Sequence, residues 1–266
     1  MPSVPLKVSL IAHTPDPEKT CALAARTCYS GLDMETLKSR VDEKDQADFL
    51  RRVVGSGHLS VLEHASFTFS IEGVSRALLA QVTRHRIASF SVQSQRYVSL
   101  EKGFGYIIPP RIRDLGDEAV AQFESQMQKM HQWYIDWQEK LGIGEAVQEY
   151  EQQMAKMHEW YIDWQKKLGS GEGSNEDARF VLPNACETHI TMTMNARELL
   201  HFFSLRCCDR AQWEIRAMAV EMLRLCKKAA PVIFENAGPS CIKGPCPEGA
   251  KSCGNALKNR EIYKNM

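Results

Sequence analysis

The alternation of apolar and polar side chains predicts three strands. Apolar residues occupy every second position of residues 65–72, which predicts a half-buried strand that Gly73 ends. Residues 188–196, THITMTMNA, alternate in the same way and predict a second strand. A weaker alternation around Val8 and Leu10 suits a short first strand.

Segments with helical periodicity lie between these strands and after them. Asp16 and Pro17 form an N-cap and first-turn pair, from which a helix is expected to run to about Cys28. Further helices are expected over residues 43–54, 75–86, 197–206 and 211–230. Because strands and helices mix without a regular βαβ rhythm, the pattern predicts an α+β fold.

A repeated segment lies in the middle of the chain. MQKMHQWYIDWQEKLG begins at Met127, and MAKMHEWYIDWQKKLG begins 27 residues later at Met154. Two copies are too few for a solenoid, so we interpret about 127–171 as a tandem duplication within one helical segment, without catalytic chemistry. Gly142 and Gly144 between the copies favour a broken helical hairpin over one continuous helix.

Composition excludes several classes of protein. Lys and Arg total 33, as do Asp and Glu, and this zero net charge argues against general duplex binding. No apolar run approaches a membrane span, and the proline-containing N-terminus does not resemble a signal peptide. Nine cysteines without a secretory context are typical of reduced thiols in a cytoplasmic protein.

We expect one domain over residues 1–238 and an irregular extension over 239–266 that is rich in Cys, Gly and Pro. Cys241, Cys246 and Cys253 of this extension have the spacing C-x4-C-x6-C, which lacks the close CxxC pair of strong zinc sites. Free thiols are therefore favoured over a metal site.

The most unusual chemistry lies at Arg84, His85 and Arg86, which are expected to close the helix over 75–86. These cations could simply complement the helix dipole. Alternatively, they could face different parts of a large anionic ligand, since hydroxyl and amide side chains suited to phosphate and carbonyl recognition follow. These side chains are Ser89, Ser91, Gln93, Ser94 and Gln95.

Arginines far away in sequence add to this picture. Arg179 and Arg197, taken singly, suit a surface position. Arg206 directly follows an apolar helix face that includes Phe202 and Phe203. A guanidinium among apolar residues needs a partner, so a buried anion or a bound ligand is expected beside it.

Arg84, His85 and Arg86, followed after seven residues by Ser94, resemble the RHR-x7-S signature of flavin-dependent thymidylate synthases. GHLSVLEHASFTFSIEG before it, and DARFVLPNACETHITMTMNARELLHFFSLR and AQWEI after it, are similar to further segments of the family in the same order. The resemblance covers roughly residues 5–235, interrupted by the duplication.

The resemblance implies a methyltransferase that converts dUMP to dTMP. Methylenetetrahydrofolate would give the one-carbon unit, FAD would carry hydride, and NADPH would reduce the flavin. It also implies helices packed on an antiparallel sheet in a cytoplasmic homotetramer with active sites between subunits, and no metal, nucleic acid or membrane partner.

The resemblance also implies roles for individual residues. FAD would be held by His58, Ser60, Arg84, His85, Arg86, Asn195, Arg197 and His201. The nucleotide would be held by Gln81, Arg84, Gln93, Ser94, Gln95, Arg96, Arg179 and Arg206. Arg206 would be the catalytic residue: it would stabilise N3-ionised uracil, which makes C5 of the ring more nucleophilic without attack by a cysteine.

One position departs from the family pattern. Many members carry an acidic residue two places before the signature serine, and this chain has Val92 there. The contact made by that carboxylate is therefore absent, and the neighbouring Gln93 offers an amide in its place.

Two alternatives follow from the residues alone. Cys207 or Cys208 could be a nucleophile, with its pKa lowered by Arg206. A non-catalytic nucleotide or single-stranded RNA-binding module could use Arg84, Arg86, Arg96 and the Trp-Tyr repeat as a stacking surface. The module would be colourless and the synthase yellow.

Overall fold

The computed structural model describes the chain except for residues 1–2, 95–97, 99–103, 142–183 and 185. The second copy of the repeat therefore lies outside the described residues. The chain divides into two compact units, which are considered separately below. Unit 1 comprises Met1–Pro5, Glu72–Ala80 and Val92–His189, and unit 2 comprises Leu6–Ile71, Gln81–Ser91 and Ile190–Met266.

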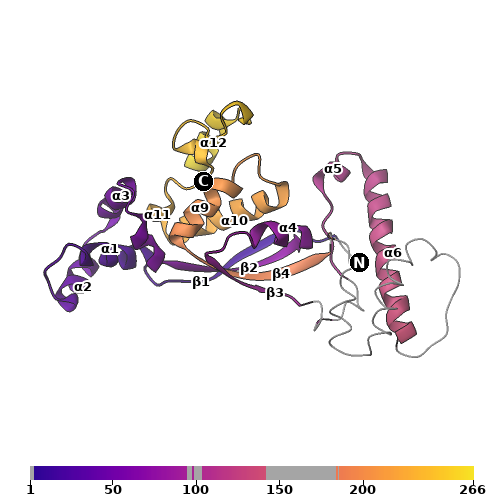
Figure 1. Ribbon diagram of the computed structural model, residues 1–266, viewed down its shortest axis with the longest axis horizontal. Helices are drawn as coiled ribbons and strands as arrows, with labels where there is room; N and C mark the ends of the chain where they lie inside the picture. The colour runs from indigo at the N-terminus through magenta and orange to yellow at the C-terminus, as the bar shows by residue number, and fades with distance from the viewer. Residues whose placement is uncertain (1–2, 95–97, 99–103, 142–183, 185) are drawn as a thin grey trace. The chain divides into compact units, whose positions relative to one another are not determined.

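The fold is α+β, as predicted, with helices and a four-stranded antiparallel sheet of order β1-β2-β4-β3 (Figure 1). The strands are β1 (Lys7–His13), β2 (Ser66–Ser75), β3 (Ala88–Val92) and β4 (Glu187–Asn195). The α-helices are α1 (Pro17–Thr27), α2 (Met34–Asp42), α3 (Ala47–Gly55), α4 (Arg76–Val82), α5 (Pro110–Arg113), α6 (Asp117–Leu141), α9 (Ala196–Arg206), α10 (Trp213–Ala229), α11 (Pro231–Phe234) and α12 (Ala256–Lys264). Short 3-10 turns are η1 (Leu59–His64), η3 (Ser240–Ile242) and η4 (Gly249–Lys251). Within the described part of the chain, no helix is both long and apolar enough to cross a membrane.

The alternating patterns do form strands. Phe67 and Phe69 of β2 are fully buried, whereas Thr68 between them is partly exposed. On the polar face, the hydroxyl oxygens of Thr68 and Thr193 lie 2.9 Å apart and join β2 to β4. The prediction that Gly73 ends the strand is wrong, because β2 continues to Ser75.

Gly73 is instead a local distortion within β2. Its φ of 68° is a backbone conformation that glycine adopts readily and that occurs at β-bulges. The Gly73 N–H donates to the Glu187 carboxylate at 3.0 Å, so a β4 side chain satisfies the backbone group that the distortion leaves. The strand therefore passes through the glycine.

Helices α1, α9 and α10 confirm their predictions, but the helix expected over residues 43–54 is wrong at its start. Helix α2 ends at Asp42 and α3 begins at Ala47. Gln46 is buried between them, and its amide donates to the carbonyl oxygens of Val41 at 3.1 Å and Lys44 at 2.9 Å. This side chain satisfies carbonyl groups of the turn that separates the two helices.

The helix expected to close with Arg84, His85 and Arg86 is also shorter. Helix α4 ends at Val82, and the three residues lie in the loop that follows Thr83. The His85 N–H donates to the Val82 carbonyl at 3.1 Å, a tight bond across three residues that ends the helix. The three side chains therefore project from a loop and not from a helix C-terminus.

Aromatic contacts join the sheet to its helices in unit 2. The ring of Phe67 in β2 meets Phe234 of α11 edge-on at 5.4 Å between centroids, and Phe234 meets Phe203 of α9 at 6.0 Å. All three rings are fully buried. Aromatic pairs of this geometry add to the free energy gained by burying their surface, so they hold α9 firmly on the sheet.

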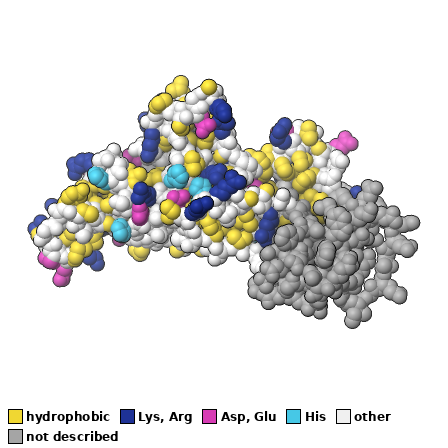
Figure 2. Space-filling view, in the orientation of Figure 1, with side chains coloured by type: hydrophobic (Ala, Val, Ile, Leu, Met, Phe, Trp, Pro, Cys, Tyr) yellow, Lys and Arg dark blue, Asp and Glu magenta, His cyan; other side chains and the backbone are white. Residues whose placement is uncertain are grey.

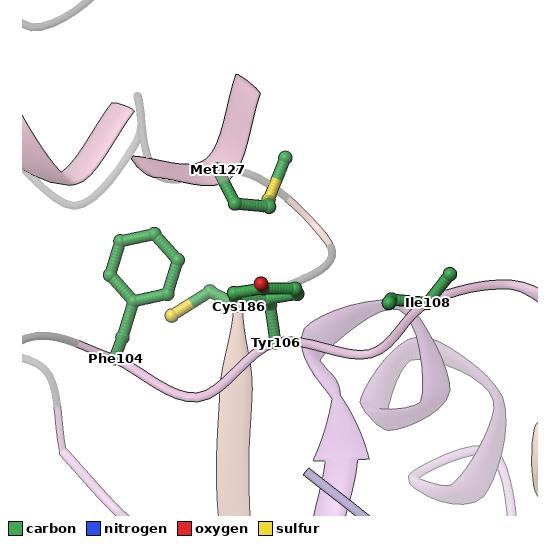
Figure 3. Packing of buried hydrophobic residues seen from close by; sticks show 5 residues of the cluster. All are labelled: Phe104, Tyr106, Ile108, Met127 and Cys186. Carbon is green, nitrogen blue, oxygen red and sulfur yellow. The ribbon is translucent and has the colours of Figure 1, made fainter. Parts of the chain in front are cut away.

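Unit 1 has its own apolar cluster, in which Phe104, Tyr106, Ile108 and Cys186 lie around Met127 of α6 (Figure 3). Met127 opens the first copy of the repeat. The first copy therefore supplies a side chain to this cluster.

The C-terminal tail is more ordered than its composition suggests, because it contains helix α12. Tyr263 of α12 is buried, and its hydroxyl donates to the carbonyl oxygen of Cys207 at 2.9 Å. The Asp209 carboxylate accepts from the side-chain amides of Asn255 at 2.9 Å and Asn259 at 3.1 Å. These contacts anchor the tail to the turn that follows α9.

We predict that Tyr263→Ala lowers the free energy of unfolding by about 3–5 kcal/mol, as expected for loss of a buried aromatic ring. Urea unfolding of the variant and the wild type measures the difference. Leu257→Ala on the same helix is the control, since Leu257 is 79% exposed and its loss should change stability by less than about 0.5 kcal/mol. If both substitutions lowered the free energy of unfolding by the same amount, Tyr263 would not anchor the tail.

Candidate active site

Helix α9 begins at a defined point beside the start of β2. The Asn195 side chain caps the helix by accepting from the Glu198 N–H at 2.9 Å. The Ala196 N–H donates to the Ala65 carbonyl at 2.7 Å. These two bonds determine which α9 side chains face the loops around η1 and after α4.

A cavity of about 700 Å³ opens at this end of α9. Its size lies within the range of roughly 300–1,000 Å³ that is usual for ligand sites. The lining residues are Val54, Leu59, Glu63, Ile87, Asn195, Arg197, Glu198, Leu200, His201 and Lys243.

Three of the residues expected to hold a cofactor, Asn195, Arg197 and His201, therefore meet in one cavity. Leu59 lies between His58 and Ser60 in sequence, and Ile87 follows Arg86, so the remaining expected residues belong to segments that border the cavity. The space-filling view shows basic side chains gathered beside histidine side chains (Figure 2).

Arg197 and Glu63 form an ion pair across the cavity lining, with 2.5 Å between Nη1 and Oε1. Both side chains are about half exposed, so water screens the pair and its contribution to stability is small. The pair therefore leaves Arg197 available to a stronger anionic partner.

Deeper in unit 2, a buried chain of polar contacts links α9 to the loop after α4. The Nδ1 atom of His85 lies 3.3 Å from Oε1 of Glu198, and its Nε2 atom lies 3.0 Å from Nε of Arg206. The Arg206 Nη2 group also donates to the Gln81 carbonyl at 3.4 Å. His85 is 6% exposed and Glu198 is 9% exposed.

These contacts determine the protonation of His85. Arginine can only donate, so Nε2 of His85 must accept from Arg206 and carry no proton. The ring proton therefore lies on Nδ1, where it donates to Glu198. Burial lowers the pKa of His85 below its ordinary value, which keeps the ring neutral.

Arg206 lies close to a second positive charge. Burial lowers the pKa of its guanidinium, and the positive charge of Arg84 lowers it further. Because Arg84 and Arg206 repel each other, a bound anion would be stabilised between them. This arrangement fits the anionic partner expected from sequence.

Gln93 and Ser94 of the predicted nucleotide site belong to unit 1. The Gln93 N–H donates to the His189 carbonyl at 2.9 Å, and its carbonyl accepts from Arg76 at 3.1 Å. These bonds anchor the backbone just before the signature serine. Other predicted site residues lie outside the described residues, namely Gln95, Arg96 and Arg179.

Sequence reasoning missed Glu63, Glu198 and Lys243, which all line the cavity. Glu198 had a signal, because Asn195 followed three residues later by glutamate is a helix-capping pattern. Glu63 and Lys243 reach the site only through tertiary packing.

Comparison with known proteins identifies the family of this chain. Residues 9–232 match the family described as "Thymidylate synthase complementing protein". The chain belongs to this family.

Three curated relatives, each named "Flavin-dependent thymidylate synthase", align over nearly their whole length. The protein of Geobacter sulfurreducens is 47% identical over 98% of this chain and 99% of its own. The relative from Clostridium tetani is 45% identical over 97% of both chains, and that of Nitratidesulfovibrio vulgaris is 43% identical over 96% of both.

The cavity of this family member fits a flavin dinucleotide. Leu59, Ile87 and Leu200 offer apolar surface to a planar ring system, while Arg197 and His201 offer donors to phosphate or carbonyl oxygens. The cavity also lies at the N-terminus of α9, whose dipole favours anions.

The structure disfavours a cysteine nucleophile at Cys207. The side chain is fully buried, and burial raises the pKa of its thiol to about 12. Cys208, Cys241, Cys246 and Cys253 line a second cavity of about 360 Å³, which Arg206 also lines. The described residues contain no group of three or more side chains placed to hold a metal there.

We predict that iodoacetamide at pH 8 leaves Cys207 unmodified in the folded protein, since its pKa of about 12 keeps the thiol protonated at that pH. The exposed Cys28 is the internal control and should be alkylated. Peptide mass spectrometry measures both sites. Alkylation of the two at similar rates would contradict the inert state of Cys207.

Proposed function

We propose that this chain is a flavin-dependent thymidylate synthase that methylates dUMP to dTMP. Methylenetetrahydrofolate donates the one-carbon unit, and FAD and NADPH are the sources of hydride. The match of residues 9–232 to the family is the main support for this proposal. The cavity adds to it, because its lining offers the apolar and polar groups that a flavin needs.

FAD occupies the cavity at the start of α9 in this proposal. Asn195, Arg197 and His201 hold it from α9, and His58, Ser60, Arg84 and Arg86 hold it from the neighbouring loops. When bound, FAD supplies hydride chemistry that amino-acid side chains lack. The protein binds and orients the flavin and the nucleotide, and it polarises the uracil ring.

Arg206 acts on the nucleotide. Two of its N–H groups face His85 and the Gln81 carbonyl, and a guanidinium has five. The remaining donors stabilise the uracil ring ionised at N3, by roughly 1.5–3 kcal/mol for a charge-assisted hydrogen bond. Negative charge on the ring makes C5 a better nucleophile, so the reaction does not require a thiolate.

The nucleotide phosphate and the ionised ring suit the excess positive charge of this region. Arg84 reaches both the flavin and dUMP, and the anionic substrate relieves its repulsion with Arg206. Gln81, Gln93, Ser94, Gln95, Arg96 and Arg179 complete the nucleotide site.

We also propose a cytoplasmic homotetramer whose active sites lie between subunits, in which residues 1–238 form the catalytic domain. Two observations support it. His58, Ser60 and Arg86 are exposed in the single chain, so a second copy could complete their surroundings. All nine cysteines are free, which suits a reducing compartment.

The visible absorption spectrum tests the function first. Purified protein should show a flavin spectrum that anaerobic NADPH bleaches, at a rate that dUMP changes. The same sample with methylenetetrahydrofolate should form dTMP. A colourless protein that takes up no FAD and binds single-stranded RNA would instead support the non-catalytic module.

We predict that Arg206→Gln lowers kcat for dTMP formation by about 10- to 100-fold, since it removes a charge-assisted hydrogen bond to the ionised ring. Arg224→Gln is the control, because Arg224 is an exposed arginine of α10 paired with Glu221. A product assay at saturating substrates measures both. Wild-type turnover by Arg206→Gln would refute the role of Arg206.

A further inference from the structure

Helix α9 carries both Glu198, in its first turn, and Arg206, at its end. His85 bridges them from the loop after α4, with 3.3 Å from Nδ1 to Glu198 and 3.0 Å from Nε2 to Arg206. Both ring nitrogens are thus occupied by groups of the protein. A polar contact from this ring to a cofactor would break one of these bonds, so His85 is better placed to serve Arg206.

The carboxylate of Glu198 determines which nitrogen of His85 can accept. A carboxylate only accepts hydrogen bonds, so it holds the proton on Nδ1 and leaves the lone pair of Nε2 facing Arg206. With the proton on Nε2, two donors would face each other across 3.0 Å. The His85 ring also packs edge-on against Phe202, with 4.8 Å between centroids, which limits its rotation.

The position of Glu198 within α9 suggests a simpler role, in helix capping. In a capping box, the third residue of the helix returns its carboxylate to the N–H of the cap residue. Here the Glu198 N–H bonds to Asn195, but its carboxylate lies against His85. The side chain therefore has a partner beyond its own helix.

We infer that Glu198 is a positioning residue for the reaction. It holds His85 in the Nδ1–H form, His85 accepts from Nε of Arg206, and this fixes the plane of the guanidinium whose remaining donors face the uracil ring. The inference rests on the proposed role of Arg206. In this inference His85 orients Arg206, and this role does not depend on contact with the flavin.

The first test is Glu198→Gln, which keeps the size of the side chain. The neutral amide loses the charge and can also donate to Nδ1, so kcat for dTMP formation should fall by about tenfold or more. Because Glu198 also lines the proposed flavin cavity, kcat is expressed per bound flavin. Reduction of that flavin by NADPH without dUMP should fall by a much smaller factor than kcat, since this half-reaction does not need Arg206. A purely structural role would lower both rates through loss of folded enzyme.

The matched control is Glu214→Gln. Glu214 is also a buried glutamate, 4% exposed, in the first turn of a helix, and its N–H is likewise bonded to a cap side chain, that of Gln212. This control should keep kcat within about twofold of the wild type. Equal losses in both variants would show a general cost of neutralising a buried glutamate and would overturn the inference.

A double-mutant cycle tests whether Glu198 affects kcat through His85. His85→Gln offers Arg206 an acceptor and Glu198 a donor, but an amide has no tautomers. In this background, Glu198→Gln should change kcat by less than about twofold. Additive losses would overturn the inference, because Glu198 would then act without His85.

The tautomer itself can be observed in the folded wild type. Nitrogen NMR of protein labelled at histidine, with the signal of His85 assigned by its absence in His85→Gln, should show the proton on Nδ1. A proton on Nε2 would overturn the inference even if a variant failed to fold. A wild type that forms no dTMP would refute the proposed function. A wild type that forms dTMP, with Glu198→Gln equally active, would refute only the positioning role.

Discussion

The bridge from Glu198 through His85 to Arg206 is the interaction on which the site depends. Moving an isolated charge out of water is costly, and His85 and Glu198 are buried while Arg206 is partly buried. A neutral imidazole between a carboxylate and a guanidinium satisfies both without adding a charge. His85 makes both contacts from the loop that follows α4.

The bridge is possible only because the sheet and its aromatic contacts hold α9 in register. The hydroxyls of Thr68 and Thr193 align β2 with β4, and the Ala196 N–H bond to Ala65 sets where α9 starts. Phe203 and Phe234 then fix the helix on the buried face. A shift of one residue in β4 would turn its buried side chains to the other face and displace both ends of the bridge.

Periodic elements could be predicted from sequence because their signal is local. The strand over residues 188–196 and the helix over 197–206 were confirmed, since alternation and helical spacing report which face is buried. The turn before α3 and the passage of β2 through Gly73 were not predicted. Each depends on one side chain, Gln46 or Glu187, that satisfies backbone groups at a break in the regular pattern.

The sequence by itself determined the α+β class and the family, because the spacing and the types of residues can be read without coordinates. It also supplied the candidate site residues, whose roles stay predictions. Only the tertiary structure decided which of them meet. It placed Asn195, Arg197 and His201 in one cavity, and it joined His85 to partners more than a hundred residues away. Hydrogen bonds over such separations leave no periodic trace in a sequence, because they depend on where packing brings two distant segments together.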